Sequence, residues 1–424
     1  MDRPSDNRSL RCGLGVWGAV GLGLGSMLGT GVFVSLGLGA AAAGGWVLVV
    51  LVLAGLLATA NALSSAQLAA VHPTSGGTYE YGYRELHPAA GFAAGWMFLC
   101  AKSASAATAA LGFAAYTLGD ATPGVRTGVA VAAVIVVSAL VFAGIKRSAA
   151  VNAAIVAIVV GSLVVLLVIV GARQDRVADN VGVELGAWPG VGLAEATALM
   201  FVAYTGYGRI ATLGEEVYEP AKTIPRAIVV TMIVTGVLYV AVAVAVLAVL
   251  GAEGLAANAG SVPLLRVAEV LDAAWLAWVV LAGACAAMLG VLLNLVLGLS
   301  RMVLAMGRRG DLPSVCAQID ARSAEPRVAV VGVGALVALL AGLGSIELAW
   351  TFSAFTVLMY YAVTNAASLR LRAQQRLYPR WVSWAGLIGC LSIGWTLEPK
   401  VWLAGLAVLA IGFVLRAIGR RVPS

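Results

Sequence analysis

The chain is built from apolar segments of about 20 residues that are separated by short polar stretches. Segments of this length cross a bilayer as helices, because a helix satisfies its own backbone hydrogen bonds where no water is present. Hydrophobic residues make up 61% of the chain and charged residues 11%, against about 25% charged residues in a soluble domain. The sequence therefore predicts an all-α integral membrane protein. Twelve spans are expected, centred near residues 28, 58, 103, 134, 159, 201, 238, 288, 335, 358, 389 and 409.

The basic residues lie mostly on one side of this predicted arrangement. With a cytoplasmic N-terminus, two of the 27 Lys and Arg residues, Lys102 and Arg209, fall within spans. Five others lie outside the cell, at Arg126, Arg173, Arg176, Arg266 and Lys400. The remaining 20 lie on the cytoplasmic side, as the positive-inside rule requires. We therefore expect a multi-pass protein of the cytoplasmic membrane with both termini in the cytoplasm, and no nucleic-acid partner.

Two of the expected spans are interrupted by glycines near the middle. Residues 25–33 read GSMLGTGVF in the first span, and residues 201–209 read FVAYTGYGR in the sixth. Unwound backbone at membrane depth is tolerated where it lines a cavity, and paired broken helices indicate a transporter's substrate site. We expect unwinding at Gly29–Gly31 and at Thr205–Gly208, with the two breaks facing each other. A packing face of small residues is the alternative for either cluster alone.

The positions of the breaks also predict an internal repeat. Breaks in the first and sixth spans suggest two five-helix repeats, at about 13–172 and 188–372, followed by two extra helices at about 380–418. Five is an odd number, so the second repeat would be inverted in the membrane. Residues 1–424 are then a single transmembrane domain.

Four stretches taken together resemble one known family. They are the two broken segments, the second extended to residue 226, the stretch PTSGGTYEYGY at 73–83, and SRMVLAMGRRGDLP at 300–313. The combination is similar to the amino acid–polyamine–organocation permease superfamily, and most of all to its bacterial cationic-amino-acid-transporter-like branch. The resemblance implies the leucine-transporter-type fold, in which helices 1, 2, 6 and 7 move against helices 3, 4, 8 and 9. It implies a secondary active transporter for an amino acid or related amine, working by alternating access.

The broken helices predict how an amino acid zwitterion would be held. The second half of helix 1 begins with free N–H groups and a positive dipole end, so the amides of Gly29, Thr30 and Gly31 are expected to bind a carboxylate. Tyr204 and Tyr207 beside the second break are interpreted as a gate or a pocket wall, with interhelical packing as the alternative for Tyr204. The substrate's ammonium would donate hydrogen bonds to the carbonyl oxygens of Ser26, Met27, Val202, Ala203 and Thr205.

Three charged residues near this site carry separate predictions. Lys102 lies near the middle of the third span, too far from either end to reach water by snorkelling, and is therefore a candidate proton carrier. Proton-linked relatives have a lysine in helix five, and the resemblance aligns Val159 with it, so either Lys102 replaces that lysine or coupling is lost. Arg209 departs from the family pattern. It is expected either to pair with Glu216 or to contact an anionic group of the substrate.

Other classes of function find little support in the sequence. The five cysteines have no metal-binding or redox spacing, and no catalytic constellation or phosphate loop is present. No enzyme activity, catalytic residue, metal or cofactor is expected. Sodium coupling is disfavoured because residues 283–290 of helix eight contain no Ser or Thr, and Asn294 is interpreted as an interhelical hydrogen bond. The expected partners are a small-molecule substrate, the lipid bilayer and protons. Exchange or facilitated transport without proton coupling, a substrate sensor and the oligomeric state stay open.

Overall fold

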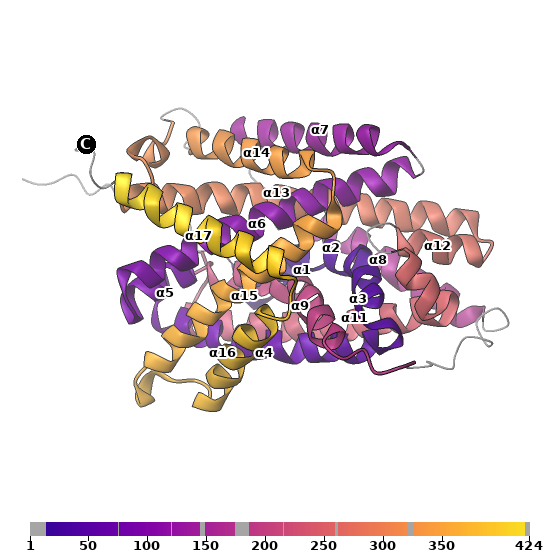
Figure 1. Cartoon of the computed structure of the whole chain (residues 1–424), viewed down its shortest axis with the longest axis horizontal. Helices are drawn as coiled ribbons and strands as arrows, with labels where there is room; N and C mark the ends of the chain where they lie inside the picture. The colour runs from indigo at the N-terminus through magenta and orange to yellow at the C-terminus, as the bar shows by residue number, and fades with distance from the viewer. Residues whose placement is uncertain are drawn as a thin grey trace, which may run out of the picture.

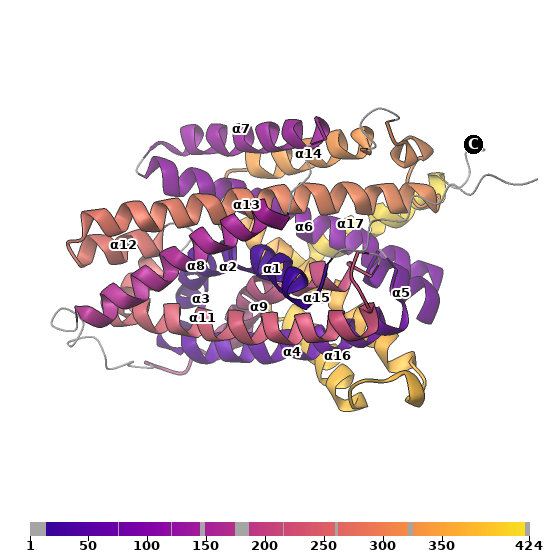
Figure 2. The same ribbon diagram turned by 180° about the vertical axis from the view of Figure 1, so that it is seen from behind.

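The computed structural model describes residues 14–74, 76–119, 121–144, 149–173, 186–214, 216–258, 262–320 and 325–419. Within these ranges the regular structure is helical, apart from one isolated parallel bridge between Leu14 and Val217. The helices form a single elongated bundle, in which α6, α7, α13 and α14 run alongside one another while α4 and α11 run along the opposite side (Figure 1). The view from behind shows the same two layers, with α8 crossing between them (Figure 2).

The helices of the first half begin with a broken span. Their bounds are α1 Val16–Met27, α2 Thr30–Phe33, α3 Ser35–Ala43, α4 Val47–Val71, α5 Thr78–Glu85, α6 Pro88–Leu118, α7 Pro123–Phe142 and α8 Ala149–Ala172. The helices of the second half also begin with one. Their bounds are α9 Gly192–Tyr204, α10 Gly208–Ala211, α11 Pro220–Ala257, α12 Pro263–Val270, α13 Ala274–Arg308, α14 Arg327–Gly342 and α15 Ile346–Arg370. Two further helices follow, α16 Arg380–Gly394 and α17 Pro399–Gly419.

Nine helical segments of the described residues are long and apolar enough to cross a membrane. They account for nine of the twelve expected spans; the others correspond to the broken pair α9–α10 and to α14 and α16, which have 16 and 15 residues. A helix of 16 residues is about 24 Å long, which is less than the roughly 30 Å of a bilayer's apolar core. The structure is therefore an all-α bundle of membrane-spanning type.

Helix α6 lies in the interior of the bundle. In the most apolar stretch of α6, 83% is buried inside the protein, compared with 22% in the corresponding stretches of α7 and α17. Its buried face consists largely of alanine, glycine and serine, and small residues allow neighbouring helices to approach closely. It contacts α13 and α15 along its length. The outer helices instead expose valine, isoleucine and leucine, as expected of surfaces that face lipid.

Two of the recognised sequence stretches meet at one end of the bundle. Residues 78–85, which follow the turn residues of the 73–83 stretch, form the short helix α5. Tyr79 of α5 donates a 2.8 Å hydrogen bond to Asp311 of the 300–313 stretch, and Tyr83 also donates to that carboxylate. Arg416 of α17 donates to the other oxygen of Asp311 at 2.8 Å and to the Tyr83 hydroxyl at 2.7 Å. We call Tyr79, Tyr83, Asp311 and Arg416 the α5 clamp.

Candidate substrate site between the broken helices

The break in the first span lies earlier than the sequence predicted. Helix α1 ends at Met27, and Leu28 and Gly29 are non-helical, with Gly29 at φ −160° and ψ −125°. Thr30 and Gly31, which were expected to be unwound, instead form the first turn of α2. Between α1 and α2, only Leu28 and Gly29 depart from helical dihedrals, so the chain re-enters a helix at Thr30. The N–H groups of Thr30 and Gly31 therefore lie at a helix N-terminus, where they have no acceptor within the helix.

The second break is a tight turn rather than an unwound segment. Helix α9 ends at Tyr204, residues Thr205–Tyr207 form one turn of 3₁₀ helix, and α10 starts at Gly208 with helical dihedrals. The expected range of Thr205–Gly208 is thus one residue too long, and its backbone is wound more tightly than an α-helix instead of being unwound. The interruption itself is present at the predicted place.

The two breaks face each other in direct contact. A Cβ built on Gly206 would lie 2.4 Å from the Met27 side chain and 2.6 Å from the Ser26 carbonyl oxygen. A Cβ on Gly31 would lie 2.8 Å from the Cβ of Ala203. Such distances are well inside van der Waals contact, so both glycines are required for the approach of the two backbones. We call this contact between Ser26–Gly31 and Val202–Tyr207 the junction.

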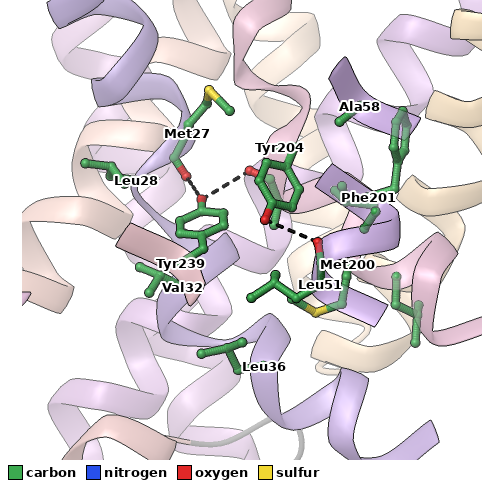
Figure 3. Close-up of a cluster of buried hydrophobic side chains, with 14 of the residues drawn as sticks. Met27, Leu28, Val32, Leu36, Leu51, Ala58, Met200, Phe201, Tyr204 and Tyr239 are labelled. Carbon is green, nitrogen blue, oxygen red and sulfur yellow. Dashed lines mark hydrogen bonds between the residues drawn. The ribbon is translucent and has the colours of Figure 1, made fainter. Parts of the chain in front are cut away.

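Two tyrosines bind carbonyl groups at the junction. The Tyr239 hydroxyl of α11 donates to the Met27 carbonyl (Figure 3). The same hydroxyl lies 3.2 Å from the carbonyl oxygen of Ala203. The Tyr361 hydroxyl of α15 lies 3.3 Å from the carbonyl oxygen of Thr205. These carbonyls are among those expected to hold an ammonium group. In this conformation, hydroxyl groups of the protein satisfy them.

Sequence reasoning missed both of these tyrosines. Tyr239 stands in the apolar run VLYVAVAV and Tyr361 follows a second tyrosine in LMYYAV. A phenol inside an apolar span is a usable signal, because its hydroxyl needs a partner when it is buried. The sequence does not show which carbonyl that partner is, since both bonds join residues more than 30 positions apart.

Lys102 points at the second break. Its ammonium donates a 2.9 Å hydrogen bond to the Oγ1 atom of Thr205, and the residue is 8% exposed. Thr205 Oγ1 in turn lies 2.8 Å from the carbonyl oxygen of Val202. The middle of α6 thus delivers a basic group to the junction. A lysine at this depth does not reach water by snorkelling, as the sequence indicated.

Aromatic rings close the junction on two sides. The Tyr204 ring packs on Tyr239 with a centroid distance of 5.1 Å, and its hydroxyl lies 3.3 Å from the carbonyl oxygen of Leu51. The Tyr207 ring packs on Tyr361 at 5.2 Å. All four tyrosine residues are at most 2% exposed. The junction is therefore closed in this conformation, and opening it requires these rings to move.

Beyond the second break, Glu216 forms its ion pair with a different arginine from the one that the sequence suggested. Glu216 forms an ion pair with Arg301 of α13 at 3.6 Å. Arg209 on α10 lies close enough to both for electrostatic interaction, so the cluster contains two arginines and one described glutamate. The neighbouring Glu215 lies outside the described residues. The expected pairing of Glu216 with Arg209 is therefore corrected to a pairing with Arg301.

Two asparagines join the first broken helix to its neighbours. Asn152 of α8 donates a 2.7 Å hydrogen bond to the Gly21 carbonyl, and Asn294 of α13 reaches the Gly25 carbonyl at 3.5 Å. The interhelical hydrogen bond expected of Asn294 is confirmed. Val159, where proton-linked relatives have a lysine, is buried and apolar. Residues 145–148, on which that alignment partly depends, lie outside the described ranges.

Two cavities of the described structure lie away from the junction. One of about 620 Å³ lies between α4, α9 and α16 and is lined by Leu56, Leu193 and Trp381 among others. Another of about 560 Å³ lies between α6, α7 and α13, with Val136 and Leu293 in its wall. Leu56, Val136 and Trp381 are exposed, so both cavities open to the apolar outer surface.

Comparison with known proteins identifies the family. A sequence model of amino acid permeases matches residues 18–419, which include the junction and nearly all of the bundle. The chain belongs to the amino acid permease family. It is a permease, and the names of the family and of the relatives below describe transport rather than catalysis.

Three relatives illustrate the range of this family. An uncharacterized transporter of Mycobacterium tuberculosis is 43% identical over 99% of this chain and 95% of its own length. A branched-chain amino acid permease of Bacillus subtilis is 28% identical over 89% of this chain and 84% of its own. A vacuolar cationic amino acid transporter of Arabidopsis thaliana is 26% identical over 76% of this chain and 57% of its own.

Proposed function

We propose that this permease is a secondary active transporter that moves an amino acid or related amine across the cytoplasmic membrane by alternating access. The observation that carries the proposal is the junction, where Gly31 and Gly206 bring two interrupted helices into backbone contact. A junction of this kind offers unpaired N–H groups and carbonyl oxygens at one place, and a zwitterion needs both.

The proposed binding mode uses the backbone on both sides. The amides of Gly29, Thr30 and Gly31 at the start of α2 hold the substrate carboxylate, aided by the positive end of that helix. The ammonium donates hydrogen bonds to carbonyl oxygens of the junction and displaces the tyrosine hydroxyls that now bind some of them. These carbonyls belong to Ser26, Met27, Val202, Ala203 and Thr205. Tyr204 and Tyr207 act as the gate, because their rings close the junction from either side.

The proposed topology has twelve spans and an inverted repeat. Helices α1–α8 and α9–α15 show the same order of a broken span, a long span, a short helix and three further spans. Equivalent members of the two halves also pack together, α6 with α13 and α7 with α14. The positive-inside rule places both termini in the cytoplasm, although many of the basic residues that support this, such as Arg8 and Arg421, lie outside the described ranges.

We further propose that transport is coupled to protons through Lys102. A buried amine that is hydrogen-bonded to the turn at Thr205–Tyr207 would favour one arrangement of the bundle when charged and another when neutral. A proton shifts such an equilibrium only if it binds the two arrangements differently, and the Lys102–Thr205 contact spans the two parts that would separate. The apolar residue at position 159 leaves Lys102 as the basic group of the junction in the described structure.

Uptake by reconstituted liposomes tests both proposals. The purified permease is expected to accumulate a radiolabelled amino acid when the pH gradient is directed inward and to lose this accumulation when the gradient is collapsed. The Lys102→Met variant should still exchange labelled for unlabelled substrate but should not accumulate it. Lys222→Met, which removes an exposed lysine, serves as the matched control and should behave as the wild type.

Three outcomes distinguish the alternatives. Accumulation by Lys102→Met with an unchanged pH dependence would make Lys102 a structural residue. Exchange without accumulation by the wild type would indicate an exchanger or facilitator without proton coupling. Binding of an amino acid without any uptake would indicate a sensor.

A further inference from the structure

We infer that the substrate of this permease carries no net positive charge, and that Lys102 is the residue that excludes cationic side chains. The inference rests on the proposed transport function and concerns the same junction. The names of the relatives do not decide the matter, because they include both branched-chain and cationic amino acids. The distribution of charge around the junction decides it.

Basic groups outnumber acidic ones among the described charges near the junction, with Lys102 and Arg209 against Glu216. The Lys102 ammonium lies 2.9 Å from Oγ1 of Thr205, a residue whose own carbonyl is among those proposed to bind the substrate's ammonium. Arg209 follows four residues later on α10. The nearby Glu216 is paired with Arg301 at 3.6 Å, so it does not leave a free carboxylate for a ligand.

Acidic residues of the described chain lie elsewhere. Apart from Glu253, which follows the kink at Gly251 near the end of α11, each Asp and Glu in these ranges stands in a loop or in the first or last turn of a helix. The first such residue before the junction on α9 is Glu195, nine residues from Tyr204, which corresponds to about 13 Å along a helix. An arginine or lysine side chain bound at the junction would therefore have no carboxylate partner among the described residues of the junction.

The protonation state of Lys102 does not change this conclusion. A charged ammonium repels a second cation across the short distances of a buried site, where the effective dielectric constant is low. A neutral amine removes the repulsion but supplies no negative charge, and a buried cation without a partner stays unfavourable. A proton-coupled cycle through Lys102 is thus compatible with the exclusion of cations at each step.

The uncharged groups around the junction suit an uncharged side chain. Met27, Val32, Phe201 and the rings of Tyr204 and Tyr239 form one buried cluster beside the breaks (Figure 3). Apolar and aromatic walls stabilise apolar side chains by removing them from water. The backbone groups of the junction would hold the carboxylate and ammonium that all amino acids share, once the substrate displaces the tyrosine hydroxyls.

Matched substrates provide a test that needs no variant. Citrulline has the shape of arginine without its charge, and norleucine has the chain of lysine without its ammonium group. With the wild-type permease in liposomes, leucine uptake should be inhibited by citrulline and norleucine, whereas arginine and lysine should inhibit on the order of 100-fold more weakly. Glutamine and glutamate complete the series and report the effect of a negative charge.

Substitution of Lys102 tests the role of this residue. Lys102→Gln should raise the ratio of arginine to citrulline inhibition by about tenfold, while Lys102→Arg, which keeps the charge, should leave the ratio as in the wild type. Arginine inhibition of the wild type equal to that of citrulline would overturn the inference while leaving the transport function intact. An unchanged ratio in Lys102→Gln would overturn the role of Lys102. Absence of both binding and uptake for every compound would instead overturn the proposed function, and the inference with it.

Discussion

At the scale of single residues, two glycines and a tyrosine set the geometry of the junction. Gly31 and Gly206 allow two backbones to touch where any side chain would overlap with the opposite helix. Tyr239 then fastens the contact, because its hydroxyl reaches carbonyls on both broken helices. The backbone atoms expected to bind substrate are therefore held together by a side chain from a third helix.

Gly31→Ala is expected to abolish uptake. The added methyl group would lie 2.5 Å from the Tyr239 hydroxyl and 2.8 Å from the Cβ of Ala203, so α2 and α9 must separate, at a cost of about 1–3 kcal/mol in the free energy of unfolding. Uptake and the thermal unfolding midpoint in detergent measure the two effects. Gly236→Ala in α11 is the matched control, since a Cβ there meets nothing within 4 Å. Wild-type uptake by Gly31→Ala would contradict the proposed binding mode.

Tyr239→Phe is expected to lower the KM for substrate and to lower the stability of the empty protein. The hydroxyl now occupies the Met27 and Ala203 carbonyls that an ammonium group would take. Its removal leaves buried carbonyls unpaired, which costs about 1–3 kcal/mol, and removes a competitor of the substrate. The substrate-induced shift in thermal unfolding midpoint should therefore be larger than in the wild type. A higher KM would show instead that the hydroxyl binds the substrate itself.

At the scale of elements, the short helix α5 connects one end of the bundle to the second broken span. The α5 clamp ties it to the loop after α13 and to α17 through Asp311 and Arg416. On its other side, Tyr81 donates a 3.2 Å hydrogen bond to the carbonyl of Ala211, the last residue of α10. Burial, together with the Asp311 carboxylate, raises the pKa of Tyr79 and of Tyr83, so both phenols stay protonated as donors at neutral pH.

Arg416→Ala is expected to destabilise the protein by about 3 kcal/mol, because it leaves the buried Asp311 carboxylate without its guanidinium partner. The Asp311 side chain is fully buried and that of Arg416 is 8% exposed. Chemical or thermal unfolding in detergent measures the loss, and Arg416→Lys should restore part of it. Lys222→Ala, which breaks the exposed pair with Glu219, should cost less than about 1 kcal/mol. Equal effects of the two alanine variants would show that the clamp contributes nothing beyond a surface ion pair.

At the scale of the whole molecule, one ion pair joins the two parts that are proposed to move. Glu216 follows the second broken span and Arg301 belongs to α13, which packs on the central helix α6. The two side chains are 24% and 47% exposed, so the pair is screened by solvent and contributes at most about 1 kcal/mol. An energy of this size changes the ratio of two conformations by about fivefold.

Glu216→Gln is expected to shift the permease toward the conformation in which the α10 end separates from α13. Labelling of a cysteine introduced at Thr212, beside α10, should become up to about fivefold faster. When Glu216 is retained, the labelling rate of this cysteine should rise with salt concentration, since screening weakens the Glu216–Arg301 pair. This salt dependence should be lost in Glu216→Gln. Glu219→Gln, in the same loop but paired with Lys222, is the control. An effect of Glu219→Gln as large as that of Glu216→Gln would assign the change to loop charge in general.

The sequence alone determined the features that depend on local chemistry. The length of the apolar segments required membrane helices, and the glycines at 29, 31 and 206 placed the two interruptions to within two residues, because backbone freedom and span length are properties of neighbouring residues. The mid-span position of Lys102 showed that it needs a partner inside the protein. Tertiary structure alone decided what that partner is, which carbonyls Tyr239 and Tyr361 bind, and that Glu216 pairs with Arg301. These contacts join residues that lie far apart in the chain, and their identity depends on how the helices are rotated and packed against one another, which no local pattern of the sequence records.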